Sequence, residues 1–289
     1  YNPTSVALSL EGSFQKHLTS NTANVPDSGK TFELTITDTS DNITDKTPIT
    51  GTATVDTLTA SSTSYTGSAN FTFKKGTEAV SALNFTAAGT YTYKVQETNS
   101  NVAGMTYDTT EYTLTVVVTD NAGALEITSA KVTKPGTSDT PVEVANLKTS
   151  FLTIENTFKA AELPLDPPTD PTQGTAKIVK SLTSDDAEKS FDFKATITET
   201  TNPSHNIPET SGEAKNVKGN ATAPFSGFGT LVFNAEGSYT FTIKEDVPTA
   251  KVPGMTYDGT THTMVVAVDE NAEKALYISS VTIDGEAID

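Results

Sequence analysis

Apolar and polar residues alternate over many short runs of this chain. One run places apolar residues at every second position: Tyr112, Leu114, Val116 and Val118. Because successive side chains of a strand point to opposite faces, this period predicts strands with one buried face. Residues 120–123 (Asp-Asn-Ala-Gly) and 269–272 (Asp-Glu-Asn-Ala) have the composition of hairpin turns. No long segment has a helical period, so we predict an all-β chain whose short antiparallel strands form β-sandwiches.

Three polar residues stand on the apolar faces of such runs. Lys16 lies between Phe14 and Leu18 at strand spacing, Glu97 ends a run with apolar residues at 91, 93 and 95, and Asn156 lies between apolar residues at 154 and 158. Lysine, glutamate and asparagine side chains are seldom buried unless they are paired. We therefore expect these three side chains to meet inside the fold.

The chain is an internal repeat. Residues 89–97 match residues 237–245, and the sequence Gly-Met-Thr-Tyr-Asp stands at both 104–108 and 254–258. Such self-similarity indicates tandem copies of one fold. Two of the three polar positions recur in the second copy, as Lys180 and Glu245.

A proline-rich segment separates the two copies. It contains Pro164, Pro167, Pro168 and Pro171, and such segments form semi-rigid spacers. We predict a first domain over residues 1–160, a linker over 161–174 and a second domain over 175–289.

Composition narrows the classes of function. The net charge of −17 argues against nucleic acid or an anionic membrane as partner, because both require basic surface. There is no cysteine, so a disulfide or a thiol nucleophile is excluded. No stretch approaches the length of a membrane span. No signal peptide precedes Tyr1, and a mature secreted chain would have lost one.

Conventional catalytic and metal sites have little support. The three histidines, His17, His205 and His262, show no metal-ligand spacing, and we interpret them as surface or structural residues. The carboxylates of residues 166–170 fit no calcium loop and are interpreted as solvated linker. Phosphate-binding loops and protease motifs are absent. We expect no cofactor and no metal.

The Lys16, Glu97 and Asn156 set has a chemistry of its own. Burial lowers the pKa of a lysine and raises that of a carboxyl group, so a neutral amine nucleophile and a proton donor become available together. The amine attacks the side-chain carbonyl of asparagine, ammonia leaves, and an amide cross-link remains. The alternative is a buried Lys–Glu ion pair beside an unreactive asparagine. The recurrence of the pair in the second copy favours the cross-link.

The order of these motifs resembles the backbone pilins of Gram-positive bacteria, in particular the two-domain streptococcal T-antigen type. The shared elements are a first-strand lysine, an aromatic-rich strand ending in glutamate, a Gly-x-Thr-Tyr-Asp turn and a last strand ending in Glu-Asn-Thr-Phe. The resemblance covers most of the chain. It implies immunoglobulin-like (CnaB-like) β-sandwich domains with self-generated Lys–Asn isopeptide bonds. Lys16 is then the nucleophile, Asn156 the electrophile and Glu97 the proton relay, with Lys180 and Glu245 as the matching nucleophile and relay.

The second domain departs from this pattern. The chain ends at Asp289, after residues 275–283, which match residues 124–132 of the first domain. The final strand that would correspond to the one carrying Asn156 is missing from the sequence, so Lys180 has no asparagine partner in the chain. We expect that this strand was trimmed, lost or supplied by another chain.

The resemblance also implies assembly by a sortase into a cell-wall-anchored, extracellular fibre. Its partners would be other pilin subunits, joined covalently through an acceptor lysine. Lys148 is the best match for that lysine, with Lys131 and Lys134 as rivals. The cross-linking step is single-turnover, so we do not expect an enzyme.

A second hypothesis is a cell-surface adhesin or ligand-binding module of the same fold. The threonine-rich insertion over residues 38–66 would then form a loop that binds a host surface ligand. A hydrolase would require an activated nucleophile, which the sequence does not offer.

Overall fold

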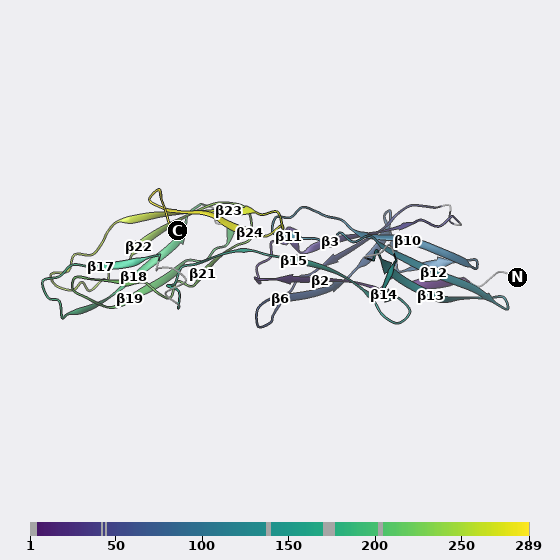
Figure 1. Ribbon diagram of the computed structural model, residues 1–289, viewed down its shortest axis with the longest axis horizontal. Coiled ribbons are helices and arrows are strands. Elements are labelled where there is room, and N and C mark those ends of the chain that lie inside the picture. The colour runs from purple at the N-terminus through teal and green to yellow at the C-terminus, as the bar shows by residue number, and fades with distance from the viewer. Residues whose placement is uncertain are drawn as a thin grey trace. The chain divides into compact units, whose positions relative to one another are not determined.

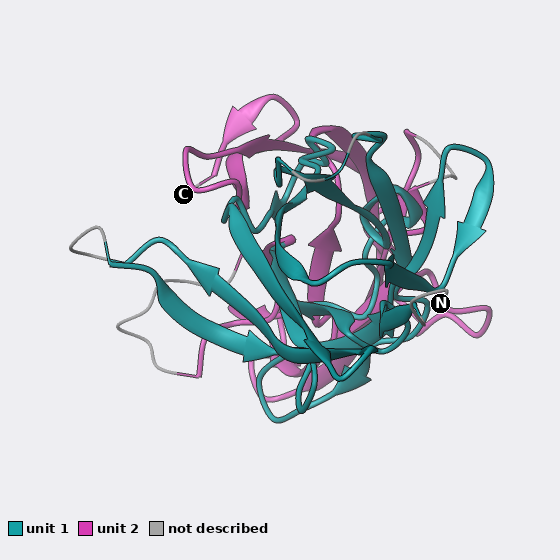
Figure 2. Cartoon of the chain, turned by 90° about the vertical axis from the view of Figure 1, so that its right-hand side faces the viewer, with its two compact units in different colours: residues 1–159 teal, residues 160–289 magenta. Residues whose placement is uncertain are grey.

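The computed structural model describes residues 5–41, 43, 45–136, 140–169, 177–201 and 205–288. The chain forms two compact units, Tyr1–Lys159 and Ala160–Asp289 (Figure 2). The regular structure of the described residues is β-strand in both units, apart from one short 3-10 helix, η1 (Asp27–Gly29). The all-β prediction is confirmed, and each unit has a hydrophobic core of its own.

The described residues of unit 1 form fifteen strands, several of which are labelled in Figure 1. They are β1 (Val6–Ser9), β2 (Phe14–Ser20), β3 (Thr31–Asp38), β4 (Ile49–Thr54), β5 (Thr59–Ala60), β6 (Tyr65–Asn70), β7 (Thr72–Lys75), β8 (Glu78–Val80), β9 (Ala82–Phe85), β10 (Gly89–Glu97), β11 (Met105–Thr106), β12 (Tyr112–Asn121), β13 (Ala124–Lys134), β14 (Val142–Asn146) and β15 (Leu152–Phe158).

The strands of unit 1 form two main sheets of a sandwich. One sheet has eight strands in the order β14-β13-β12-β10-β3-β4-β7-β8, and the other has five in the order β11-β15-β2-β6-β5. The neighbours β2 and β15 run parallel, whereas the sequence pattern predicted antiparallel strands. Parallel neighbours need a crossover connection, and here nearly the whole unit provides it.

The alternating run on β12 behaves as predicted. Its apolar side chains at 112, 114, 116 and 118 are buried, and the threonines between them face outward or lie half-buried. A β-bulge interrupts the β12–β13 register between Val117 and Val118, and a bulge at the matching place in unit 2 lies between Ala267 and Val268. The repeat thus extends to an irregularity of the backbone.

The insertion over residues 38–66 is not a single loop, contrary to the prediction. It includes β4, which pairs with both β3 and β7, and the short strand β5. The reason is a period of two that the threonine-rich composition obscured: Ile49, Ala53 and Val55 are all buried on one face.

The described residues of unit 2 form ten further strands. They are β16 (Ala161–Pro164), β17 (Val179–Leu182), β18 (Ser190–Glu199), β19 (Thr210–Lys218), β20 (Ala221–Pro224), β21 (Thr230–Phe233), β22 (Gly237–Glu245), β23 (Thr261–Glu270), β24 (Leu276–Ile283) and β25 (Glu286–Ala287).

One six-stranded sheet of unit 2 has the order β19-β18-β22-β23-β24-β25, and two strand pairs, β16–β21 and β17–β20, complete the unit. The strand β17 corresponds to β2, because Lys180 stands at the place of Lys16. It pairs with β20 as β2 pairs with β6. Among the described residues of unit 2, no strand occupies the position that β15 has beside β2.

The predicted linker differs from the structure at its start. Residues 161–164 form β16, which pairs antiparallel with β21, and Leu163 and Leu165 are 5% and 1% exposed. These alternating apolar residues bind the segment to unit 2, so it begins inside that unit. Residues 170–174 of the predicted linker lie outside the described residues.

Candidate functional site

Three strands from two sheets bring Lys16, Glu97 and Asn156 together. In the parallel pair, Lys16 of β2 lies opposite Ile154 of β15, and Asn156 lies two positions further along, opposite Leu18. Because side chains alternate, Lys16 and Asn156 project from the same face as diagonal neighbours. Glu97 is the last residue of β10, which belongs to the other sheet.

The carboxylate of Glu97 lies between the amine and the carboxamide. Lys16 Nζ donates to Glu97 Oε1 at 2.5 Å, and Asn156 Nδ2 donates to the same oxygen at 3.1 Å. The three residues are almost fully buried, with exposed fractions of 0% for Lys16, 7% for Glu97 and 2% for Asn156. A single carboxylate oxygen therefore contacts both the candidate nucleophile and the nitrogen that would leave.

Burial moves the pKa values of the two ionisable groups toward each other. Loss of hydration lowers the pKa of Lys16 from its ordinary value to about 8, although the nearby Glu97 charge opposes the shift. Loss of hydration also raises the pKa of Glu97, against the opposing effect of Lys16. The Lys16 ammonium lies 4.5 Å from the centre of the Phe32 ring, and this contact attracts the charged form of the amine.

The sequence reasoning missed one contributor to this site, the backbone of Asp108. Its N–H lies 3.2 Å from Glu97 Oε2 and 2.9 Å from Asn156 Oδ1. Asp108 ends the first copy of the repeated Gly-Met-Thr-Tyr-Asp motif. The duplication of the motif could have drawn attention to this turn. The sequence could not show that the turn donates a hydrogen bond, because nearly every residue type has a backbone N–H.

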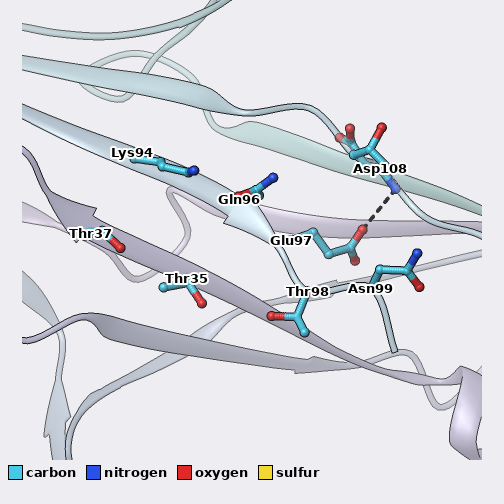
Figure 3. Close-up of a pocket in the computed structure, with 9 residues that line it drawn as sticks. Thr35, Thr37, Lys94, Gln96, Glu97, Thr98, Asn99 and Asp108 are labelled. Atoms are coloured by element: carbon cyan, nitrogen blue, oxygen red, sulfur yellow. Dashed lines mark hydrogen bonds between the residues drawn. The ribbon is translucent and has the colours of Figure 1, made fainter. Parts of the chain in front are cut away.

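A polar surface groove of about 610 Å³ passes beside the site. Figure 3 shows residues that line it, with the Glu97 carboxylate directed at the backbone nitrogen of Asp108. Although Glu97 contributes to the wall, its side chain is only 1% exposed. The groove therefore lies next to the site, but the side chains of Lys16 and Glu97 remain buried.

Unit 2 repeats part of this arrangement. Lys180 Nζ and Glu245 Oε2 form an ion pair whose side chains are 11% and 8% exposed. The Lys180 ammonium lies 4.4 Å from the centre of the Phe193 ring, as that of Lys16 lies near Phe32. Glu245 Oε1 is buried and has no hydrogen-bond partner among the described residues. The acceptor that receives Asn156 in unit 1 is thus unoccupied in its unit 2 counterpart.

The three lysines considered as acceptors lie in different surroundings. Lys148 is exposed just after β14, and its Nζ donates to the carbonyl oxygen of Ile127 at 2.6 Å. Lys131 forms an ion pair with Glu143 at 2.8 Å. Lys134 lines a second polar pocket, near β14 and β15.

The histidines lie apart from these sites and from one another. His17 contacts Ser68 Oγ at 2.9 Å, His205 contacts Glu199 Oε1 at 2.5 Å, and His262 contacts Asp284 Oδ2 at 2.6 Å. Within the described ranges, no group of three or more His, Asp or Glu residues is arranged to hold a metal ion. None of the helical segments in those ranges has the length and apolar character to cross a membrane.

Asp166 is not the solvated linker residue that the sequence suggested. Its Oδ1 accepts from the backbone N–H groups of Gly227 and Phe228 at 2.7 and 2.8 Å, and its Oδ2 accepts from Gly229 N–H at 3.2 Å. Asp170, the other carboxylate of that motif, lies outside the described residues.

Comparison with protein families gives one match, which spans both units. Residues 13–159 and 176–288 each match FctA, described as the Spy0128-like isopeptide containing domain. The two ranges contain every residue of the two polar sets described above. Among curated proteins, none matches the chain significantly.

Several solved structures are similar to the chain at low sequence identity. The major pilin protein T-13 from Streptococcus pyogenes is 15% identical with a TM-score of 0.39, covering 98% of this chain and 95% of its own. The T3.2 major pilin of the same species is 14% identical with a TM-score of 0.35, covering 94% of each chain. The pilus adhesin SpaC from Lactobacillus rhamnosus GG is 16% identical with a TM-score of 0.34, covering 96% of this chain and 28% of its own.

Proposed function

The chain belongs to the FctA family of Spy0128-like isopeptide containing domains, and from this premise we propose that an amide bond joins Lys16 to Asn156, with Glu97 as proton relay. We propose that the protein is a structural subunit of the Gram-positive major pilin type, which assembles with other pilin subunits into an extracellular pilus; the match of both units to the isopeptide containing domain supports this. The observation that carries the proposal is the position of Glu97 Oε1, within hydrogen-bond distance of both Lys16 Nζ and Asn156 Nδ2.

The reaction begins with a proton transfer inside the buried pair. Glu97 takes a proton from the Lys16 ammonium, because the two pKa values have moved toward each other and the neutral pair is accessible. The free amine attacks Asn156 Cγ, so that the Nζ–Cγ bond forms and the carbonyl oxygen becomes an oxyanion.

Collapse of this intermediate breaks the Cγ–Nδ2 bond. Glu97 returns its proton to Nδ2, which leaves as ammonia, and takes the second proton that Nζ loses. That proton stays on the carboxyl group or passes to the ammonia as ammonium. The reaction occurs once per chain, so the protein is not an enzyme in the sense of turnover.

The bond would stabilise unit 1 without cysteine chemistry. It closes a loop of about 140 residues, which on the chain-entropy estimate used for disulfides contributes roughly 5 kcal/mol. The bond also joins β2 to β15 within one sheet, while Glu97 of β10 belongs to the other sheet. Because the chain has no cysteine, this stabilisation is independent of redox conditions.

We extend the proposal to unit 2, where Lys180 is the nucleophile and Glu245 the relay. The support is the buried Glu245 Oε1, which has no partner among the described residues, whereas Glu97 Oε1 accepts from Asn156. The missing component is a strand that lies beside β17 and carries an asparagine in phase with its apolar residues. A segment from outside the described residues, or from another subunit, would supply it.

We also propose that a sortase joins the subunits through Lys148 and anchors the fibre to the cell wall. The exposure of Lys148 just after β14 suits an enzyme that must reach the amine. Lys148→Arg, compared with Lys131→Arg and Lys134→Arg, should abolish the covalent ladder of subunits on the source cell while the other two variants retain it.

The accurate intact mass of the purified full chain tests the cross-link. We expect a mass lower than that of the sequence by one ammonia, and the uncorrected mass for both Glu97→Ala and Asn156→Ala. An uncorrected mass for the unmodified protein would contradict the proposal. A deficit of two ammonia molecules would mean that unit 2 contains an electrophile of its own.

A further inference from the structure

The backbone N–H of Asp108 points at the reacting end of Asn156. It lies 2.9 Å from Asn156 Oδ1 and 3.2 Å from Glu97 Oε2. One backbone donor therefore contacts both the electrophile and the relay of the cross-linking reaction proposed above. Because backbone N–H groups move only with the chain, whatever fixes the Asp108 backbone also fixes this contact.

The contact to Oδ1 lies where charge develops. Attack of the Lys16 amine on Asn156 Cγ turns the carbonyl oxygen into an oxyanion, and a fixed donor at 2.7–3.1 Å stabilises that charge in a water-excluded site. The observed distance of 2.9 Å lies within this range. The same hydrogen bond draws electron density from Cγ before attack and so favours the electrophile.

The side chain of Asp108 holds its own backbone in place. Its Oδ1 accepts from the backbone N–H of Thr110 at 2.9 Å, which closes a local turn. Its Oδ2 accepts from the hydroxyl of Tyr112 at 2.7 Å. Tyr112 is 7% exposed and begins β12, so the turn is attached to a strand of the eight-stranded sheet.

Unit 2 has a related arrangement at the matching positions. The backbone N–H of Thr260 donates to Asp258 Oδ1 at 2.9 Å. His262 stands where Tyr112 stands in unit 1, and its Nε2 lies 4.0 Å from Asp258 Oδ2. The hydrogen bond from the residue two positions on to the aspartate is thus part of the repeat, whereas His262 bonds to Asp284 at 2.6 Å and only approaches Asp258.

We propose that Asp108 and Tyr112 are positioning residues for isopeptide formation, which hold the Asp108 N–H as the oxyanion donor to Asn156. The inference rests on the proposed cross-link between Lys16 and Asn156. It adds two residues that never touch the attacking amine, and it assigns them an effect on the rate of cross-linking.

The rate can be measured on the full chain made by cell-free synthesis. Translation is stopped, samples are quenched in acid at intervals, and the fraction that has lost ammonia is read from the intact mass. Asp108→Ala removes both side-chain contacts. Asp108→Asn removes the charge but keeps an oxygen for Thr110 N–H and an amide that donates to the Tyr112 hydroxyl. Tyr112→Phe removes the hydroxyl alone.

Tyr91→Phe is the matched control. Tyr91 is a buried tyrosine of unit 1 whose hydroxyl donates to Ala87 O at 2.8 Å, away from the three reacting residues. Melting temperatures of the Asp108 and Tyr112 variants on an Asn156→Ala background, where no cross-link forms, separate lost stability from lost rate.

We expect Tyr112→Phe to cross-link about tenfold more slowly, less than the 10²–10³ that loss of a direct oxyanion donor typically costs. Asp108→Ala should be slower still, and Asp108→Asn and Tyr91→Phe should remain close to the unmodified rate. Equal rates for Tyr112→Phe and the unmodified chain would overturn the proposal. So would an Asp108→Asn variant as slow as Asp108→Ala, because the charge of Asp108 would then be responsible.

The cross-link and the positioning role of Asp108 and Tyr112 are refuted by different results. If the unmodified chain never loses ammonia, the cross-link itself is refuted, and the positioning role with it. If the unmodified chain cross-links and Glu97→Ala does not, while every Asp108 and Tyr112 variant keeps the unmodified rate, only the positioning role is refuted.

Discussion

The reactivity of Lys16 toward Asn156 depends on the protonation states of Lys16 and Glu97. With a lowered lysine pKa and a raised glutamate pKa, the ionic and neutral forms of the pair differ less in free energy than in water. The reactive form carries one proton, on Glu97, beside a neutral amine. A neutral amine beside a protonated carboxyl group is scarce in water near neutral pH, but it is accessible to this buried pair.

The rate of cross-linking should fall at both ends of the pH range. Below the raised pKa of Glu97, both groups are protonated and the amine cannot attack. Above the Lys16 pKa of about 8, the pair loses its shared proton, and no acid remains to protonate the leaving nitrogen. Ammonia loss followed by mass at a series of pH values measures this. A rate that keeps rising well above pH 8 would show that the free amine alone suffices.

Replacing Glu97 and replacing Asn156 should have unequal costs. Both variants lose the loop closure, roughly 5 kcal/mol. Glu97→Ala also leaves a buried lysine without its carboxyl partner, which typically costs about 3–5 kcal/mol, less whatever deprotonation of the lysine recovers. We expect Glu97→Ala to melt below Asn156→Ala and both below the parent, by calorimetry. A Glu97→Ala chain that still lacks one ammonia would show that Glu97 is not the relay.

At the scale of elements, β16 depends on a carboxylate as well as on its apolar side chains. The strand is followed directly by Leu165 and Asp166, and Asp166 accepts hydrogen bonds from three consecutive backbone N–H groups. Two of those belong to Gly227 and Gly229, whose φ angles of 99° and 76° lie in the left-handed region that glycine adopts without strain. The connecting segment is thereby fastened to unit 2.

Asp166→Ala should destabilise unit 2 by about 1 kcal/mol, because it removes the acceptor of the part-buried Phe228 N–H, whereas the exposed N–H groups of Gly227 and Gly229 can bond to water. Asp185→Ala is the control, since Asp185 is an exposed aspartate of the same unit. Urea unfolding of both variants gives the difference. Equal midpoints would mean that water replaces the carboxylate without loss.

The strands and the polar set were predictable from the sequence to different degrees. Alternation identified β12 and placed Lys16, Glu97 and Asn156 on buried faces, because burial of one face leaves a period of two. The parallel pairing of β2 and β15 left no such trace, since the alternation of a strand does not encode the direction of its neighbour. The contacts of Asp166 and Asp108 were missed because backbone N–H groups are common to nearly all residue types.

At the scale of the whole molecule, the cross-link would turn most of unit 1 into a covalent ring. A specific protease site inserted after Ser61, in an exposed segment between β5 and β6, tests this. The cleaved chain should migrate as one species on a denaturing gel, because Lys16–Asn156 still joins the pieces. The same insertion in Asn156→Ala should give two fragments. Two fragments from the cross-linked parent would exclude the ring.

The parallel pairing of β2 and β15 also sets how unit 1 bears a pulling force. When the two chain ends are pulled apart and β1 has detached from β9, the load enters at the start of β2 and leaves at the end of β15, so it shears this pair along its length and does not peel it open. With the cross-link in this path, residues 17–155 carry no load. Breaking the path by Asn156→Ala should release about 140 residues, roughly 480 Å of chain at about 3.4 Å each. Single-molecule extension of the two proteins measures that length, and an equal extension of both would place the load elsewhere.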